Sequence, residues 1–402
     1  IIITTFFLLN TGNINAQSPI TLNAAIDTAL KNNLTLRNEK INAEYFQKLK
    51  GTAWNLPQTS VGLEYGQINS YYNDNRFAVS QSIKFPTVYT RQKNLYEEEW
   101  KTGLLNVAVK ETELKRKVAE VFYELIYLQQ KQKLLQQSDS IYAGFLEKTA
   151  LRFKTGESNV LENITAETQH GHVNQQLQQL MQDYAIVQLQ LKLLLNTVTD
   201  FIPSQDNFKI QLTALADTSA INGHPYIKQL QQQQAVNMAK LKLEKSKLSP
   251  DLFAAYNNTT MKGFGADDKY YSISKRFQSV QAGVGIPLFA GAQKNSIKAM
   301  NINLQVTENN YAAGLQSLQS KYEQALLQYK KNTTFVNYYE SKALKNAETI
   351  IQTANEQFLN GDINYLEWVL LTNQAIAIQN EYIDAVKNLN NTIIEINFYF
   401  NQ

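Results

Sequence analysis

Two glutamates occupy matching places in a repeated motif of this chain. The pattern Phe-x-x-Gly-x-x-x-x-Leu-Glu occurs twice and ends at Glu162 and at Glu367. Carboxylates that gather at one place in an assembly attract cations and repel anions. Glu162 and Glu367 are therefore candidates for groups that select ions by charge. The open alternative is that both face water on an outer surface.

The residues that precede these glutamates suit helix ends that contact another protein. Gly156 and Gly361 are predicted to end helices, because glycine readily adopts the left-handed conformation found there. Arg152 lies four residues before the first glycine and offers fork-shaped hydrogen bonding to carbonyls or carboxylates. Gln357 has the matching place in the second copy. We expect two exposed turns, of which the Arg152 turn contributes more to docking.

Enzyme and metal chemistry find little support in the composition. The chain has no Cys, three His and four Met, so disulfides and thiolate metal sites are excluded. His170 and His172 are two residues apart and point in different directions on a helix, which favours solvated side chains over metal ligands. His224 precedes a proline and is interpreted as a helix-start residue. Without a Gly-rich phosphate loop, no enzymatic activity, cofactor or resident metal is expected.

Prolines divide the 402 residues into alternating kinds of segment. Two long stretches, 87–202 and 288–402, lack proline, the strongest helix breaker. Their apolar residues follow heptads, which predicts coiled-coil packing, and each stretch is expected to form a long helical hairpin. A proline-bracketed segment precedes each stretch, at 57–86 and at 250–287, and the tripeptide Gln-Lys-Asn follows each bracket at the same distance. The chain is therefore a two-fold internal repeat.

The proline-bracketed segments alternate with period two, as strands do. One face is apolar, the other is small or charged, and each strand is near ten residues long, which is typical of outer-membrane barrels. A sheet of a soluble protein with one solvent-exposed face has the same pattern and remains the alternative. Gln81 departs from the apolar face. Val79 and Val284 are expected near mid-membrane. The residues expected to face lipid are Val61, Leu63, Val79, Ile83, Val280 and Val284.

The number of strands has a consequence for assembly. Four strands cannot close a barrel, and open sheet edges are not tolerated in lipid. Closure therefore needs several chains, and the spacing does not choose between two and three.

The net charge of +3 is too small to indicate a nucleic-acid-binding surface.

The chain is expected to comprise a leader and two structural repeats. Residues 1–16 look like the remnant of a secretory signal peptide, with a buried or disordered N-terminal strand as the alternative. The first repeat, 17–202, would contain a helix, a strand pair near 58–86 and a helical hairpin. The second repeat, 203–402, would repeat this order with its strand pair near 251–287.

With these features in place, residues 18 to 400 resemble the TolC family of outer-membrane efflux proteins. The resemblance rests on the heptapeptide Gly285–Gly291, on His224-Pro225, on Ala29–Asn33 and on the two hairpin glycines. It implies a mainly α fold with a membrane β-barrel. The protein would be a homotrimer whose twelve strands lie in the outer membrane of a Gram-negative bacterium, above a helical tunnel in the periplasm. A mixed region near the termini and the 197–222 connection would surround the tunnel.

The resemblance also implies a function and partners. Segments 56–59, 64–67 and 85–89 look like the CusC and CzcC branch that serves heavy-metal pumps, although the lipidated cysteine of the CusC pattern is missing. The chain would then be the passive channel of a tripartite efflux pump, with a periplasmic adaptor and an inner-membrane pump of the RND type. Its substrates would be heavy-metal cations or other small toxic solutes.

Two other functions stay open. The first is a channel for drug efflux or type I protein secretion. The second is a periplasmic coiled-coil scaffold without a pore, which would not need alternating ten-residue strands. In the leading interpretation Glu162 and Glu367 are gate residues, and the turns at Gly156 and Gly361 bind the adaptor.

Overall fold

The computed structural model describes residues 18–157, 159–204, 207–212 and 218–400. The expected signal peptide lies outside these residues. The chain forms two compact units, each of which takes parts of both sequence repeats. The helical unit comprises Ile1–Arg37, Val109–His224 and Gln316–Gln402, and the sheet unit comprises Asn38–Ala108 and Pro225–Leu315. Among the described residues, no helix is both long and apolar enough to cross a membrane.

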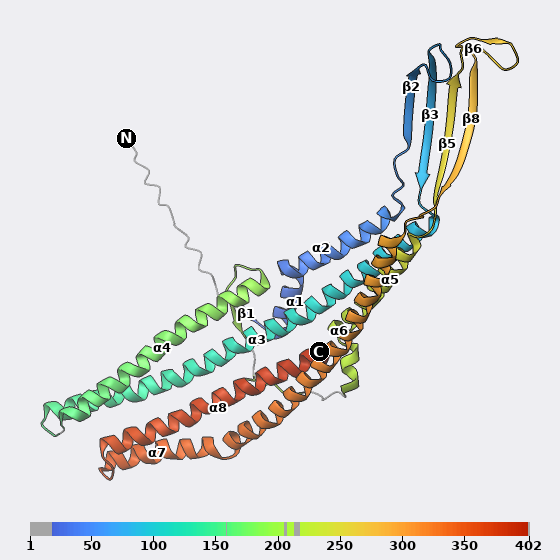
Figure 1. Ribbon diagram of the computed structural model, residues 1–402. Helices are drawn as coiled ribbons and strands as arrows, with labels where there is room; N and C mark the ends of the chain where they lie inside the picture. Colours follow the sequence, from blue (N-terminus) through green and yellow to red (C-terminus); the bar gives the residue numbers. More distant parts are fainter. Residues whose placement is uncertain (1–17, 158, 205–206, 213–217, 401–402) are drawn as a thin grey trace, which may run out of the picture. The chain divides into compact units, whose positions relative to one another are not determined.

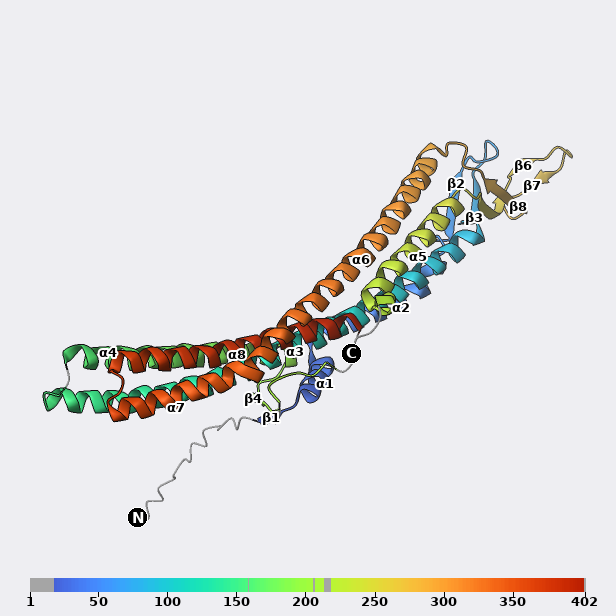
Figure 2. The ribbon, with the colours of Figure 1, turned by 90° about the horizontal axis from the view of Figure 1, so that it is seen from below.

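The helical unit is built from two antiparallel hairpins, as predicted (Figures 1 and 2). The first pairs α3 (Pro86–Lys154) with α4 (Val160–Leu195), although the start of α3 belongs to the sheet unit. The second pairs α7 (Leu344–Asn360) with α8 (Tyr365–Phe400). The heptad residues of α3 are buried, as coiled-coil packing requires: they are Leu114, Val118, Val121, Leu125 and Leu128.

The second copy differs from the first by an interruption in its long helix. After α6 (Gly291–Tyr338), a π-helical turn spans Tyr339–Ala343 and leads into α7. Such turns are rare inside α-helices and are found often at functional sites. The heptad pattern alone does not indicate it.

A short connecting segment, 207–212, is fastened to this π-helical turn. Lys209 Nζ donates to both carboxylate oxygens of Glu340, at 2.7 and 2.8 Å, and the Tyr382 hydroxyl donates to the same carboxylate at 3.2 Å. The apolar side chains on either side of Lys209, Phe208 and Ile210, pack against a buried cluster on α6 and α8. The segment therefore binds the π turn through a charge pair and the neighbouring helices α6 and α8 through apolar contacts.

A small mixed region completes the helical unit. Strand β1 (Ser18–Ile20) pairs in parallel with β4 (Phe201–Pro203), and a 3-10 turn spans Thr218–Gly223. Helix α1 (Leu22–Asn32) follows β1 and is capped by the Thr21 hydroxyl. The predicted mixed structure near the N-terminus and in the 197–222 connection is therefore present.

In the sheet unit, the described residues form a four-stranded antiparallel sheet in the order β2-β3-β5-β8. The strands are β2 (Ser60–Gly66), β3 (Asp74–Ile83), β5 (Asp251–Thr260) and β8 (Arg276–Gly285), which confirms both predicted strand pairs. A small hairpin between β5 and β8 was not predicted. It consists of β6 (Gly263–Phe264) and β7 (Tyr270–Tyr271).

Helices pack together in the same unit. Besides parts of α3 and α6, they are α2 (Leu34–Leu49), a 3-10 turn at Lys50–Trp54, and α5 (Pro225–Ser246). Their core joins α3 to α5 through Val88, Leu95, Val236, Ala239 and Leu243. Helix α5 begins at Pro225, where proline lacks only an N–H group that has no partner at a helix start.

Candidate functional site: the hairpin tips and the open sheet

Both hairpins turn at a glycine in the left-handed conformation, as the sequence predicts. Gly156 has a φ of 79°, its N–H donates to Phe153 O at 3.2 Å, and Glu157 N donates to Arg152 O at 2.9 Å. The same pair of bonds recurs around Gly361, whose φ is 82°. This bonding satisfies carbonyls that a helix end would otherwise leave unpaired. The two tips are therefore local structural equivalents.

We expect Gly156→Ala to destabilise the first tip. A Cβ at Gly156 meets no atom within 4 Å, so the cost of about 1–2 kcal/mol is backbone strain alone. Gly171, which also has open space around it, lies within α4, where alanine should instead stabilise by about 0.5–1 kcal/mol. Thermal unfolding and proteolysis at the turn measure both changes. Equal shifts for the two variants would contradict a strained turn.

The side chains of Arg152 and Gln357 differ as the sequence suggests. Arg152 is half-buried, and its Nη2 donates weakly to Glu157 O at 3.5 Å across the turn. Gln357 is exposed. A long bond leaves most of the guanidinium donors of Arg152 available, since arginine has five. The first tip thus presents a cation and the second a neutral amide.

Both candidate glutamates lie in the first turn of a helix and help to begin it. Glu162 N donates to Asn159 Oδ1 at 3.0 Å. Glu367 forms a reciprocal pair with Asn364: each backbone N–H donates to the other side chain, at 2.9 and 3.0 Å. This arrangement is a capping box, and a carboxylate there also interacts favourably with the helix dipole. The Asn-x-x-Glu spacing indicates this capping role, which was not predicted.

An aromatic cluster next to the tips joins the two hairpins. Phe145 of α3 stacks on Tyr365 and Trp368 of α8, with ring centroids 4.6 and 4.2 Å apart. The Trp368 indole N–H donates to Asn355 Oδ1 at 2.7 Å, and the Tyr142 hydroxyl donates to an α8 amide oxygen at 2.8 Å. This cluster was not predicted from the sequence.

Glu162 lies close enough to this cluster for its carboxylate to affect the pKa of Tyr365. Burial raises the pKa of the Tyr365 phenol to about 12, and the neighbouring Tyr142 and the carboxylate of Glu162 add to the rise. Since Tyr365 belongs to α8, the Glu162 side chain lies near the second hairpin of its own chain. Glu162 is half-buried, whereas Glu367 is exposed.

The histidines form no metal site in the part of the chain that the structure describes. His170 is not simply solvated, because its Nε2 lies 3.2 Å from Asp139 Oδ1. His172 instead pairs with Gln176 at 3.1 Å. His224 is 3% exposed and packs against the Phe398 ring, and burial lowers its pKa. No group of three or more His, Cys, Asp or Glu is placed to hold a metal within the described residues.

The strand register places the six predicted apolar residues on one face of the sheet. Val61 lies opposite Val79, which is opposite Tyr256, which in turn is opposite Val280. In the single chain this face is uncovered: Leu63 is 84% and Val280 82% exposed. An uncovered apolar face requires a partner or a non-aqueous environment.

The register also separates two residues that were expected at one level. Val284 of β8 lies opposite Leu252 of β5, which pairs with Ile83 of β3. All three residues therefore lie at the end of the sheet where the strands connect to helices. Val79 lies in the middle of β3 and shares its level with Val280. Val280, rather than Val284, is therefore the mid-strand counterpart of Val79.

Gln81, the polar residue on the apolar face, is satisfied locally. Its side-chain nitrogen donates to Pro57 O and to Ser82 O, both at 2.9 Å, and its side-chain oxygen accepts from the Thr59 hydroxyl at 2.6 Å. A buried amide costs little when it is hydrogen-bonded. Gln81 therefore does not contradict an apolar environment on this face.

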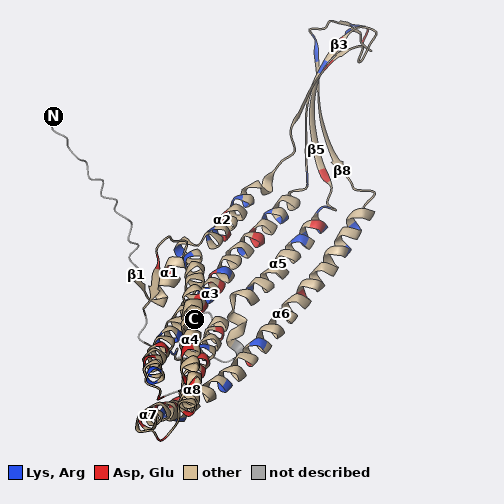
Figure 3. Cartoon of the chain, turned by 90° about the vertical axis from the view of Figure 1, so that its left-hand side faces the viewer, with Lys and Arg blue, Asp and Glu red and all other residues tan. Residues whose placement is uncertain are grey.

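Charged side chains of the sheet lie only near strand ends, and Figure 3 shows long uncharged stretches between them. Glu64 and Arg76 face each other across β2 and β3 and form an ion pair at 3.0 Å. The charged residues of the four strands are Glu64, Asp74, Arg76, Asp251 and Arg276. The uncharged zone and the exposed apolar face thus coincide.

Comparison with known proteins gives a fold. No protein-family model and no curated protein matches the sequence. Solved structures do match. A CusC structure described in terms of transmembrane channel formation has a TM-score of 0.79 at 15% identity, covering 94% of this chain and 91% of that chain.

Two further channels match in the same way. The outer-membrane channel OprN gives a TM-score of 0.81 at 14% identity, covering 94% of this chain and 89% of its own. The CmeC outer membrane channel of Campylobacter jejuni gives 0.79 at 14% identity, covering 94% and 85%. The chain therefore has the fold of outer-membrane channels of the TolC type, with helical hairpins and an antiparallel sheet in a two-fold repeat.

Proposed function

We propose that this chain is the outer-membrane channel of a tripartite efflux pump. The observation that supports this most is the sheet. Among the described residues, β2 and β8 each have a neighbour on one side only, and the apolar face is uncovered. Unpaired edges are not tolerated in lipid, so the sheet needs other copies of the chain to close it. A homotrimer would supply twelve strands, with the hairpins in the periplasm.

We further propose that the cargo is a heavy-metal cation or another small toxic solute. The segments 56–59, 64–67 and 85–89 support the heavy-metal branch, and the paired tip carboxylates suit cations. Drug efflux or type I secretion is the alternative within the same fold. In either case a periplasmic adaptor and an inner-membrane pump, of the RND type in the metal branch, must supply the energy.

The experiment that tests the channel and its gate is conductance in planar bilayers. In a trimer Glu162 and Glu367 would place six carboxylates near the narrow end. We expect the double variant Glu162→Gln, Glu367→Gln to lower the cation-to-anion permeability ratio, and more strongly at low salt, where screening is weaker. Glutamine can still form the capping box, so the helix starts should persist.

The matched control replaces Glu167 and Glu356 by Gln, two exposed carboxylates on α4 and α7. This control should leave the reversal potential unchanged. If the tip variant shows the same ratio as the wild type, the tip carboxylates face the outer wall. If the wild-type protein does not conduct at all, the scaffold without a pore becomes the better interpretation.

The hairpin tips are proposed to dock the adaptor. Both turns are polar and exposed, and the first presents Arg152, whose planar cation suits carbonyls and carboxylates. We expect Thr155→Cys and Asn360→Cys to crosslink to the adaptor in living cells, with the Thr155 site giving the higher yield. Crosslinking only at cysteines placed mid-helix would show that the adaptor wraps the side of the hairpins.

A further inference from the structure

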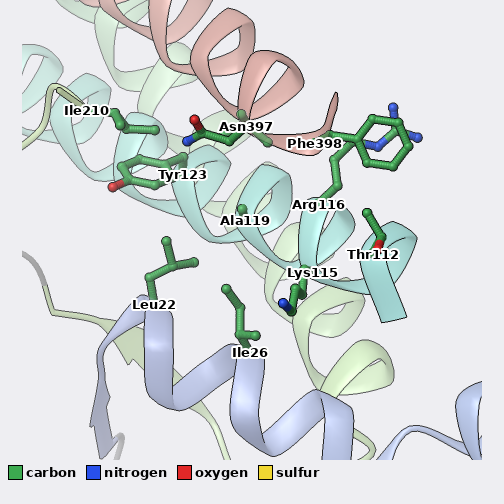
Figure 4. Close-up of a pocket in the computed structure, with 11 residues that line it drawn as sticks. Leu22, Ile26, Thr112, Lys115, Arg116, Ala119, Tyr123, Ile210, Asn397 and Phe398 are labelled. Atoms are coloured by element: carbon green, nitrogen blue, oxygen red, sulfur yellow. The ribbon is translucent and has the colours of Figure 1, made fainter. Parts of the chain in front are cut away.

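A small apolar cavity lies inside the helical unit, away from the hairpin tips. Its volume is about 110 Å³, and Figure 4 shows it between α1, α3 and α8. Its apolar wall consists of Leu22, Ile26, Ala119, Tyr123, Ile210, Ile394 and Phe398. Tyr123 and Ile394 are each 5% exposed, so the inner wall is part of the packed core. Leu22, Ile26 and Lys115 are only half-buried, so the cavity has a packed inner wall and is partly open to solvent.

Two cations line this cavity, and they differ in their partners. Arg116 Nη1 donates to Glu395 at 2.9 Å, and the guanidinium lies 4.4 Å from the centre of the Phe398 ring. Lys115 also lines the cavity, on the side of α3 that faces Ile26 in Figure 4. It has no hydrogen-bond or ion-pair partner among the described residues. One positive charge at the cavity is thus balanced and the other is not.

We propose that this cavity binds a small carboxylate with an apolar body of about four to six carbons. The size follows from volume, since a dry apolar cavity of roughly 150 Å³ binds benzene. The charge follows from Lys115, because an ammonium group bonds a carboxylate more strongly than a neutral acceptor. The Asn397 amide, also at the wall, offers a further donor.

Binding would join three elements that are distant in sequence. A ligand that fills the cavity contacts α1, α3 and α8 at once and binds only the folded unit. It therefore raises the thermal unfolding temperature in proportion to the logarithm of its concentration above Kd. This inference does not depend on the proposed channel function, and its test needs no transport.

The test uses the full chain and hexanoate as the probe, with hexanol as its neutral analogue. Calorimetry should show saturable binding of one hexanoate per chain, and hexanol should bind at least about tenfold more weakly, as expected for a lost charged hydrogen bond. Lys115→Met should cause the same loss for hexanoate. Lys133→Met, at an exposed lysine on the same helix, should change nothing.

Two variants fill the cavity from opposite walls. Ile26→Trp adds bulk from α1 and Ala119→Leu adds bulk from α3, and both should abolish binding while circular dichroism retains the helix content. Either filled variant suffices if the other misfolds. The proposal is overturned if hexanoate fails to saturate, if hexanol binds equally well, or if a folded, filled variant still binds. In the first case the hollow is a packing gap without a ligand.

Discussion

Arginine in place of Val79 or Val280 is expected to prevent stable insertion of the protein in the outer membrane. Both residues lie mid-strand on the uncovered apolar face. An arginine at the bilayer midplane on the lipid side of a barrel costs roughly 2–4 kcal/mol, and the cost falls towards zero near the interfaces. Val284 lies close to the end of β8 that leads into α6, so Val284→Arg should have a smaller effect. If the chain forms the proposed trimer, the amount of heat-resistant trimer in outer-membrane fractions measures all three.

The matched control places arginine on the opposite face of the same strands. Ser80 and Ser279 directly adjoin Val79 and Val280 in the chain, and their side chains point to the other side of the sheet. Ser80→Arg and Ser279→Arg should give near-normal trimer, because that face would line the water-filled interior. Wild-type trimer levels for Val79→Arg and Val280→Arg would show that the apolar face does not meet lipid.

Much of this architecture was predictable because it depends on local rules. Proline positions marked where strands give way to helices, and both strand pairs are where the alternation placed them. The turns at Gly156 and Gly361 followed from the conformational freedom of glycine, and both glycines have a positive φ. These features need only neighbouring residues to be recognised.

The features that were missed depend on contacts between distant segments. The π turn at Tyr339–Ala343 has no signal in the heptads, and its bond from Lys209 to Glu340 joins segments far apart in sequence. The position of Val284 along the strand direction follows from the strand register, which periodicity alone does not provide. The capping box at Glu367 has a local sequence signal, Asn364-x-x-Glu367, but the charge of Glu367 alone does not indicate it.

Removal of the Phe145 ring is expected to give the largest loss of stability in the helical unit. Phe145 is 5% exposed and stacks on two rings of α8. Phe145→Ala deletes a buried aromatic side chain and should lower the free energy of unfolding by about 3–5 kcal/mol. Hydrogen exchange should increase first in α7 and α8 near the tips, since the cluster joins the two hairpins there.

The control makes the same change at an exposed phenylalanine of the same unit. Phe335 in α6 is 54% exposed, so Phe335→Ala should change stability by less than about 0.5 kcal/mol in the single chain. Comparable losses for the two variants would mean that Phe335 is covered in the assembly. A small loss at Phe145 would mean that the aromatic stack does not hold the hairpins together.

The pairing of β3 with β5 determines the order in which the sheet can form. The ladder joins Ile83 to Leu252, and the whole of α3, α4 and α5 lies between these strands in the chain. Contacts between residues so distant in sequence form slowly, because a long loop must close first. The hairpin of β2 and β3 can therefore form before it pairs with β5, and until then its apolar face and unpaired edge are exposed to water. Such a strand edge invites wrong pairing. We therefore expect the yield of correctly paired sheet to depend on a chaperone that shields this hairpin until β5 pairs with β3; in the proposed location this chaperone would be periplasmic.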